Sequence, residues 1–135
     1  MDYIKRGNNG VVLKTESGIE IINGGIKKYL NDLCLNNLAT FDGRKKAIGK
    51  LLKEKKNLPI YINYQLFVYP TKALREYDVI FINYHHVLSY KEITPTHTKI
   101  IFNNLDELII DISFKRVEKQ HQRIAYILEY LGEHS

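Results

Sequence analysis

The first third of the chain shows two hydrophobic patterns, one typical of strands and then one typical of a helix. The short apolar runs "YIKR", "VVLK" and "IEII" are separated by "GNNG" and "TESG". Short runs divided by turn-forming residues are typical of strands in a meander. Further along, Ile26, Tyr29, Leu30 and Leu33 recur at the i, i+3, i+4 and i+7 spacing of an amphipathic helix. The pattern therefore predicts three strands followed by a helix.

A second helix is predicted after residue 40. Thr40 or Asp42 is able to cap a helix that begins near Gly43. At about 100° per residue, apolar and basic side chains separate onto opposite sides of this helix. The apolar side comprises Ala47, Ile48, Leu51 and Leu52, and the basic side comprises Lys46, Lys50 and Lys53. The apolar side is expected to dock on a sheet, which leaves a lysine stripe outside. Lys55 and Lys56 extend this stripe past the helix end.

The remaining pattern is mostly that of strands. "IYI" and "LFVY" predict a hairpin, "VIFIN" a further strand, and "KIIF" with "LIIDI" a second hairpin. Residues 88–97 are polar and contain Pro95, which favours a loop. A last helix follows the N-cap residue Ser113. The predicted order is three strands, two helices, five strands and a helix. Because strands and helices do not alternate, the fold class is α+β with a mainly antiparallel sheet, about three helices and the longest helix at the C-terminus.

Length and composition favour one globular domain over residues 1–135. A chain of 135 residues with 44% hydrophobic and 26% charged residues is large enough for a core and lies near globular averages. The single cysteine, Cys34, cannot form an internal disulfide, and the N-terminus lacks the apolar stretch of a signal peptide. No apolar run approaches the roughly 18 residues that span a bilayer. We therefore expect a cytoplasmic protein and no membrane partner.

The positive charge of the chain is concentrated in one segment. The whole chain carries 20 Lys and Arg against 15 Asp and Glu, a net charge of +5. Residues 40–56 hold seven of the basic residues beside Asp42 and Glu54, and the rest of the chain balances at 13 against 13. Such a cluster is either a solvated helix face or a surface that binds a phosphate backbone or another anionic partner.

Catalytic and metal sites have weaker support. His85 and His86 are adjacent and would point to opposite faces of a strand, while His121 falls within the apolar stripe of the last helix. A metal-dependent nuclease would need carboxylates that hold an ion beside a lysine, for which Glu54 and Lys56 are candidates. These two residues are, however, expected to close a helix. We predict no catalytic residues, no metal site, no cofactor and no enzymatic activity.

Several short segments together resemble the ComK family of competence transcription factors. They are "GRKKA" at 43–47, "QLFVYPT" at 65–71, "INYHHV" at 82–87, "FNN" at 102–104, and "IS" at 112–113 followed by Glu118, Gln120 and Arg123. Each segment is weak alone, but five in order with compatible spacing cover residues 38–131. The resemblance implies a DNA-binding activator that recognises paired AT-rich boxes, largely through the minor groove, as an oligomer. Arginine or lysine entering a narrow AT-rich minor groove would suit the basic cluster.

The resemblance and the charge pattern together predict the site and its partners. The expected DNA-binding residues are Arg44, Lys45, Lys46, Lys50, Lys53, Lys55, Lys56, Lys72 and Arg75. Lys72 and Arg75 are included because they follow the Pro-Thr segment on a predicted loop, although a solvated loop is the plainer interpretation. The expected partners are AT-rich double-stranded DNA, further copies of this chain, and RNA polymerase or a full-length family member.

Two departures from the family pattern leave alternatives open. The chain is shorter at the N-terminus, and "YLGEHS" ends it without the C-terminal extension that in the family serves recognition by a Clp protease adaptor. These departures leave open whether proteolytic control by that route and full activator competence are retained. The first alternative is a reduced family member that modulates a full-length activator by association or by occupying its sites. The second alternative is the nuclease.

Overall fold

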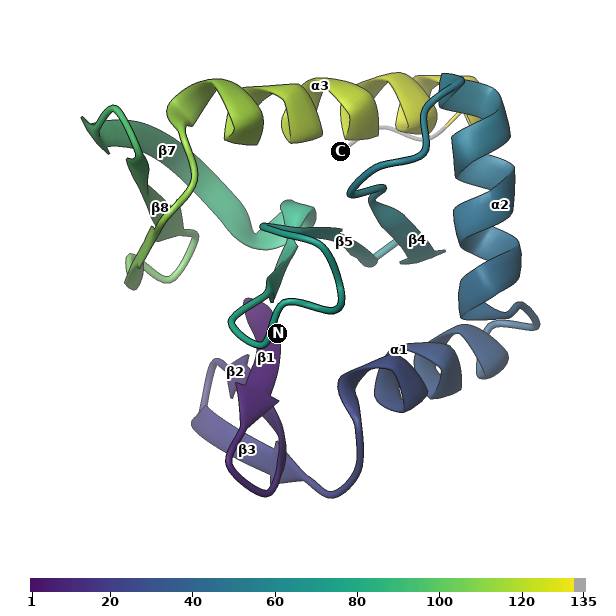
Figure 1. The fold of residues 1–135 in the computed structure, drawn as a ribbon, viewed down its shortest axis with the longest axis horizontal. Helices are drawn as coiled ribbons and strands as arrows, with labels where there is room; N and C mark the ends of the chain where they lie inside the picture. The colour runs from purple at the N-terminus through teal and green to yellow at the C-terminus, as the bar shows by residue number, and fades with distance from the viewer. Residues whose placement is uncertain (133–135) are drawn as a thin grey trace.

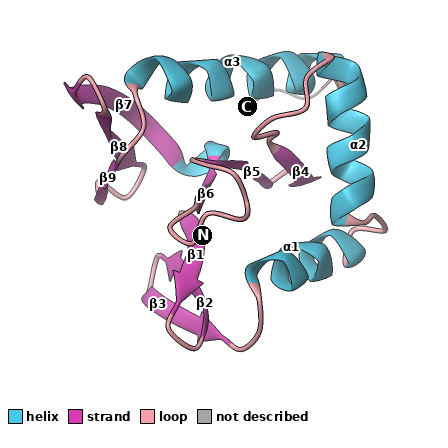
Figure 2. Cartoon of the chain, in the orientation of Figure 1, coloured by secondary structure: helices cyan, strands magenta, loops and turns pink. Residues whose placement is uncertain are grey.

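Three α-helices and nine strands make up the part of the chain that the structure describes, residues 1–132 of a computed structural model (Figures 1 and 2). The strands are β1 Tyr3–Gly7, β2 Gly10–Thr15, β3 Gly18–Ile22, β4 Ile60–Asn63, β5 Leu66–Pro70, β6 Ile80–Asn83, β7 Val87–Thr94, β8 His97–Phe102 and β9 Glu107–Ile110. The helices are α1 Ile26–Leu35, α2 Phe41–Leu52 and α3 Phe114–Tyr130, with a short 3₁₀ helix at Tyr84–His86. The predicted α+β class is confirmed, as is the position of the longest helix.

The strands form two antiparallel sheets. The larger sheet has the order β3-β2-β1-β6-β5-β4, so the N-terminal meander joins the central strands through the pairing of β1 with β6. The smaller sheet is the meander β7-β8-β9. Each described pairing is antiparallel, including that of β1 with β6, which are far apart along the chain.

The larger sheet carries a hydrophobic cluster on each face. Successive side chains of a strand point to opposite faces, so Val68 and Phe81 join one cluster while Phe67, Tyr69 and Ile82 join the other. The first cluster is covered by α1, and the second by α3 and the smaller sheet. Because α2 runs beside the β4 edge, it contributes to both clusters (Figure 1).

The predicted polar loop at residues 88–97 is wrong. Residues 87–94 form β7, an edge strand paired with β8, and the chain turns only near Pro95. Its side chains are mostly exposed, with Val87 and Tyr90 half-buried. An edge strand with so few buried positions shows little apolar alternation, so its sequence resembles that of a loop.

The second helix begins two residues earlier than predicted. Thr40 is the N-cap, and its hydroxyl accepts a hydrogen bond from the backbone N–H of Gly43 at 2.9 Å. The helix therefore starts at Phe41, whose buried ring anchors the first turn. Ala47, expected on the docked side, is exposed, because Ile48 is the residue that points into the core.

Candidate nucleic-acid interface

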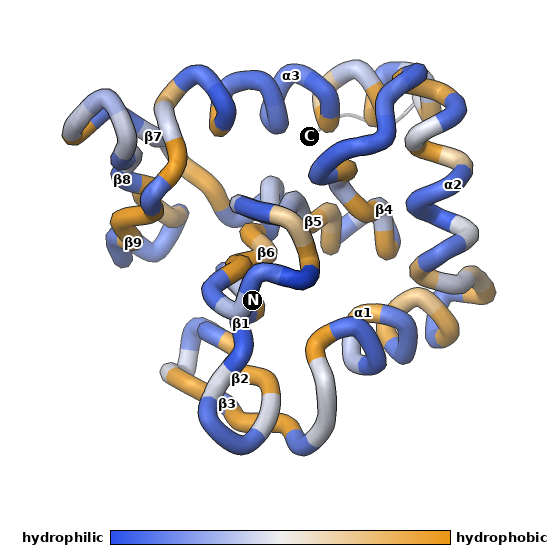
Figure 3. Tube along the Cα trace, in the orientation of Figure 1, coloured by the Kyte–Doolittle hydropathy of each residue, from blue (hydrophilic) through white to orange (hydrophobic). Residues whose placement is uncertain are grey.

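The lysine stripe of α2 lies on the surface as predicted. Lys46, Lys50 and Lys53 are exposed, while Ile48 on the other side is only 6% exposed. The helix ends because Lys53 adopts a left-handed conformation with φ of 55°. From there the chain turns back towards β4, and Lys55 lies beside the stripe. Figure 3 shows this connection as a continuous hydrophilic run between α2 and β4.

The close return of this connection explains the glycine at position 49. The Glu54 N–H donates to the Gly49 carbonyl at 3.2 Å. A Cβ atom at position 49 would lie 3.0 Å from the Glu54 carbonyl oxygen and 3.1 Å from Leu58 Cδ1. A side chain here would therefore push the basic connection away from the helix.

An arginine of α3 fixes the same connection from its other side. Arg123 is 8% exposed, and its guanidinium donates to both carboxylate oxygens of Glu54, at 3.3 and 2.6 Å. It also donates to the backbone carbonyls of Lys56 and Asn57. Gln120, 5% exposed, adds a 2.7 Å hydrogen bond to the Asn57 carbonyl. We call this set of contacts the Arg123 clasp; it holds the backbone that carries Lys55 and Lys56.

The clasp strongly favours the ionised form of Glu54. Hydrogen bonds from Arg123 and then from Lys119, whose ammonium lies 3.0 Å away, lower the pKa of Glu54 from 4.5 to about 2. Since the pKa is lower in the folded state, the carboxylate stabilises the fold above about pH 4.5, and this stabilisation is lost as the pH falls towards 2.

We therefore predict that Glu54→Gln changes the acid sensitivity of the protein. Wild type should be the more stable at neutral pH, and its advantage should shrink between about pH 5 and pH 2. Urea unfolding of both proteins over this range measures the difference. Other carboxylates with a lowered pKa, such as Asp111 beside Lys72, contribute equally to the unfolding free energy of both proteins, so their contribution cancels in the difference. A difference that stays constant with pH would contradict the assigned role of Glu54.

A second arginine secures the loop that carries Lys72 and Arg75. This loop connects β5 to β6, and Arg6 of β1 donates to the backbone carbonyls of Leu74 and Glu76, both at 2.6 Å. Lys72 lies between Asp78 and Asp111, at 2.5 and 2.6 Å. These two carboxylates raise the pKa of Lys72 and occupy its ammonium. Arg75 is exposed and is therefore the better placed of the two predicted cations for contact with a partner.

The structure brings most of the predicted residues together around two hollows. One hollow, of about 550 Å³, lies along the α2 stripe, and the other, of about 350 Å³, lies between the α2–β4 connection and the β5–β6 loop. Lys45 and Lys55 line both, which makes the two hollows neighbours. We call their eight cations the basic surface: Lys45, Lys46, Lys50, Lys53, Lys55, Lys56, Lys72 and Arg75.

Arg44 stands apart from the basic surface. It is half-buried, and its guanidinium carbon lies 5.1 Å from the centre of the Tyr61 ring in a cation–π contact. It lines a separate hollow together with Ile127 and Tyr130 of α3. This position favours a structural role for Arg44, which the sequence placed among the expected DNA-binding residues.

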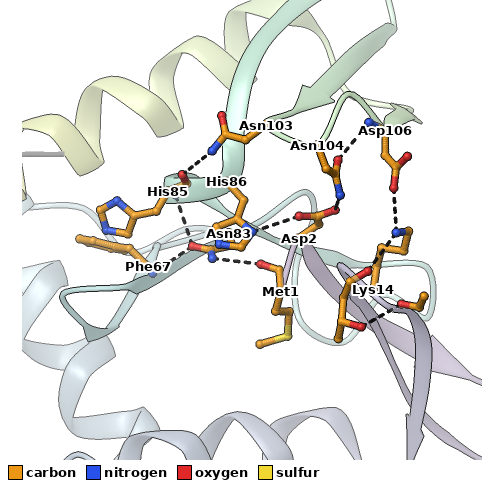
Figure 4. Close-up of polar contacts among 12 residues, drawn as sticks. Met1, Asp2, Lys14, Phe67, Asn83, His85, His86, Asn103, Asn104 and Asp106 are labelled. Atoms are coloured by element: carbon orange, nitrogen blue, oxygen red, sulfur yellow. Dashed lines mark hydrogen bonds and ion pairs between the residues drawn. The ribbon is translucent and has the colours of Figure 1, made fainter.

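Several of the motif residues connect the two sheets. The Asp2 side chain, 2% exposed, hydrogen-bonds with His86 Nδ1 at 3.1 Å and accepts a bond from Asn104 Nδ2 at 3.0 Å (Figure 4). Asn83 Oδ1 accepts the backbone N–H of His85, and Asn103 Nδ2 donates to the His85 carbonyl. The strand position expected for the two histidines is wrong, because both lie in the 3₁₀ helix. "INYHHV" and "FNN" therefore build the sheet junction and are not part of the basic surface.

His121 is a packing residue, as its place in the apolar stripe predicts. Tyr84 and Tyr90 pack against its ring, with centroids 5.0 and 4.6 Å away, and its Nε2 hydrogen-bonds with the Tyr69 hydroxyl at 2.8 Å. Burial lowers the pKa of His121 to about 4, so the imidazole is neutral at physiological pH. Cys34 is completely buried, and burial raises the pKa of its thiol.

The carboxylate considered for metal-dependent chemistry is held by cations. Glu54 binds Arg123 and Lys119. Within residues 1–132, no three side chains of His, Cys, Asp or Glu are grouped so that they could hold a metal ion.

The residues that position the basic surface are not among the expected DNA-binding residues, although the family motif includes Gln120 and Arg123. Arg6, Gln120 and Arg123 lie far along the chain from the loops that they hold. One signal was present, because Gln120 and Arg123 fall on the same side of α3 as Val117 and Ile124, which are buried. Polar side chains in a buried stripe need hydrogen-bond partners. The sequence does not say which partners these are.

The fold and this surface define a small antiparallel α+β protein whose excess positive charge is gathered on one helix and two anchored loops. No helix of the described residues is long and apolar enough to cross a membrane. The family model for the ComK protein matches residues 5–134, nearly the whole chain. The chain belongs to the ComK family and is a transcription factor of the competence type; the family is not one of enzymes. No curated protein and no solved structure matches it significantly.

Proposed function

We propose that this protein is a cytoplasmic regulator that binds AT-rich boxes in double-stranded DNA, largely through the minor groove. The observation that carries the proposal is the basic surface, on which eight cations from α2 and two loops lie around adjoining hollows. A surface of this kind supplies phosphate contacts, which position a protein on a duplex without reading its sequence. Sequence preference then requires a side chain that enters a groove.

Arg75 is the proposed groove residue. It is exposed on the β5–β6 loop, where Arg6 holds the flanking backbone in place. AT-rich minor grooves are narrow and have an enhanced negative potential that attracts arginine. A fixed loop also presents its side chain without a large entropy cost on binding. Arg75 therefore combines charge, access and a constrained backbone.

The proposal includes assembly of several copies of the chain. Paired boxes call for paired subunits, because the spacing of half-sites mirrors the symmetry of the protein. The edge strand β3 exposes two apolar side chains, Ile19 and Ile21, each 67% exposed. Apolar residues on an unpaired sheet edge are a common feature of surfaces that associate.

The test is a salt titration of binding to AT-rich and GC-rich duplexes of equal length. Wild type should prefer the AT-rich duplex. Arg75→Ala should lower this preference by about 1 to 3 kcal/mol and weaken GC-rich binding less. Arg75→Lys is the matched control, because it keeps the charge and should retain non-specific binding.

Equal losses of affinity on both duplexes would reduce Arg75 to a phosphate-binding residue. If wild type itself showed no preference, the minor-groove proposal would be wrong. A reporter promoter distinguishes an activator from a modulator, because only an activator raises transcription when it binds alone.

A further inference from the structure

A further hollow, of about 280 Å³, lies where the first half of α3 meets the α2–β4 connection. Its charged lining consists of Lys55, Lys56, Arg116, Lys119, Arg123 and Glu54. Five of these side chains are cationic and one is anionic, which leaves a net charge of +4 around one concave site. Its volume is several times the ~30 Å³ of a water molecule, so a larger group fits.

The positive charges in this hollow are only partly compensated. Glu54 is already bound by Arg123 and Lys119. The side chains of Lys55, Lys56 and Arg116 make no hydrogen bond or ion pair with any other residue of the range 1–132. Like charges that line one cleft repel each other, and low-dielectric walls strengthen their field. An anion bound among them would relieve this repulsion.

The hollow is constructed from fixed parts. Its wall includes Arg123, Gln120 and Thr71, which are 8%, 5% and 2% exposed. The Arg123 clasp holds the backbone of Lys56, and Ser113 caps α3 by accepting the Arg116 N–H at 3.3 Å. The guanidinium of Arg116 has the planar fork that suits two oxygens of one phosphate. The chemistry of the site therefore favours a phosphate group.

We propose that this hollow binds a phosphate of the DNA backbone, which makes the first half of α3 part of the interface. The inference rests on the proposed DNA-binding function and extends it to residues outside the basic surface. Lys55 lines this hollow and both hollows of the basic surface, and Lys56 lines this one and the hollow beside the β5–β6 loop. A DNA strand that lies along the basic surface therefore reaches this hollow next. Arg116 and Lys119 are the added contacts.

The experiment compares two double variants of equal charge. Lys56→Gln with Arg116→Gln removes two cations of the hollow, whereas Lys28→Gln with Lys91→Gln removes two exposed cations outside it. If the first variant neutralises one phosphate fewer, the salt slope of binding should fall by about 0.9 and binding should weaken roughly eightfold at 0.1 M salt. The effect should be equal on AT-rich and GC-rich duplexes, since phosphates carry no sequence. The control variant should keep the wild-type slope.

A second arm uses inorganic phosphate at an ionic strength matched with chloride. Phosphate should weaken the binding of DNA to the wild-type protein more than chloride does. This difference between the two anions should disappear in the double variant Lys56→Gln with Arg116→Gln. If wild type binds DNA but the two double variants have the same slope, the inference is wrong while the proposed function stands. Phosphate binding at the hollow with an unchanged DNA slope would assign the site to a free anion and overturn the backbone assignment. If wild type binds no duplex, the proposed function fails, and the backbone assignment fails with it, whatever the phosphate titration shows of the hollow.

Discussion

Replacing Arg123 by methionine should lower the free energy of unfolding by on the order of 3 kcal/mol. The guanidinium is almost fully buried and donates to Glu54 and to the backbone carbonyls of Lys56 and Asn57. Removal of the arginine leaves these acceptors without their donor, and the cost of unpaired polar groups exceeds the value of the pair itself. Urea unfolding at neutral pH measures the change.

Lys119→Met is the matched control for this substitution. It removes a cation from the same carboxylate, but Lys119 is 58% exposed and should contribute less than about 1 kcal/mol. The double variant Glu54→Gln with Arg123→Met should be less destabilised than the sum of the two single variants. Equal effects of Arg123→Met and Lys119→Met would show that the clasp is no stronger than a surface ion pair.

The lysine stripe should account for a large part of the affinity for DNA. Simultaneous replacement of Lys46, Lys50 and Lys53 by glutamine should reduce the salt slope by up to roughly 0.9 for each phosphate that the variant no longer neutralises. If each lysine neutralises one phosphate and the affinities are equal near 1 M salt, binding at 0.1 M weakens by up to roughly 500-fold. Fluorescence anisotropy at several salt concentrations gives both quantities.

The control for the stripe is a triple replacement with the same change in net charge. Lys28, Lys91 and Lys99 lie on α1, β7 and β8, away from the stripe. Their replacement by glutamine should leave the slope within about one unit of wild type. If the two triple variants have the same salt slope, DNA binding depends on the net charge of the protein and not on the stripe.

Sequence periodicity predicts those elements that bury a regular face. In α3, residues such as Val117 and Ile124 recur at helical spacing and are completely buried. In β7 the same approach fails, because the edge strand buries too few side chains to leave a pattern. Ala47 shows a smaller limit, since a small residue beside the apolar stripe of α2 is compatible with either side.

The sequence likewise predicts only part of the candidate site. Local charge density identifies Lys46, Lys50 and Lys53, because these residues share one helix face. It does not place Arg75 near Lys55, because that proximity depends on two loops meeting over the sheet. Nor does it show that Lys72 is occupied by Asp78 and Asp111, the second of which lies 39 residues away. Such contacts depend on the tertiary structure, and a local sequence pattern does not predict them.

The distance along the chain between Glu54 and Arg123 also determines the order in which the two residues are synthesised. The two residues are 69 positions apart, so the α2–β4 connection emerges from the ribosome well before the arginine that fixes it. At roughly 5–20 residues per second, this delay is several seconds. During that time the nascent chain carries the lysine cluster on a connection that Arg123 does not yet hold. The clasp therefore fixes this cationic connection only after Arg123 has been synthesised.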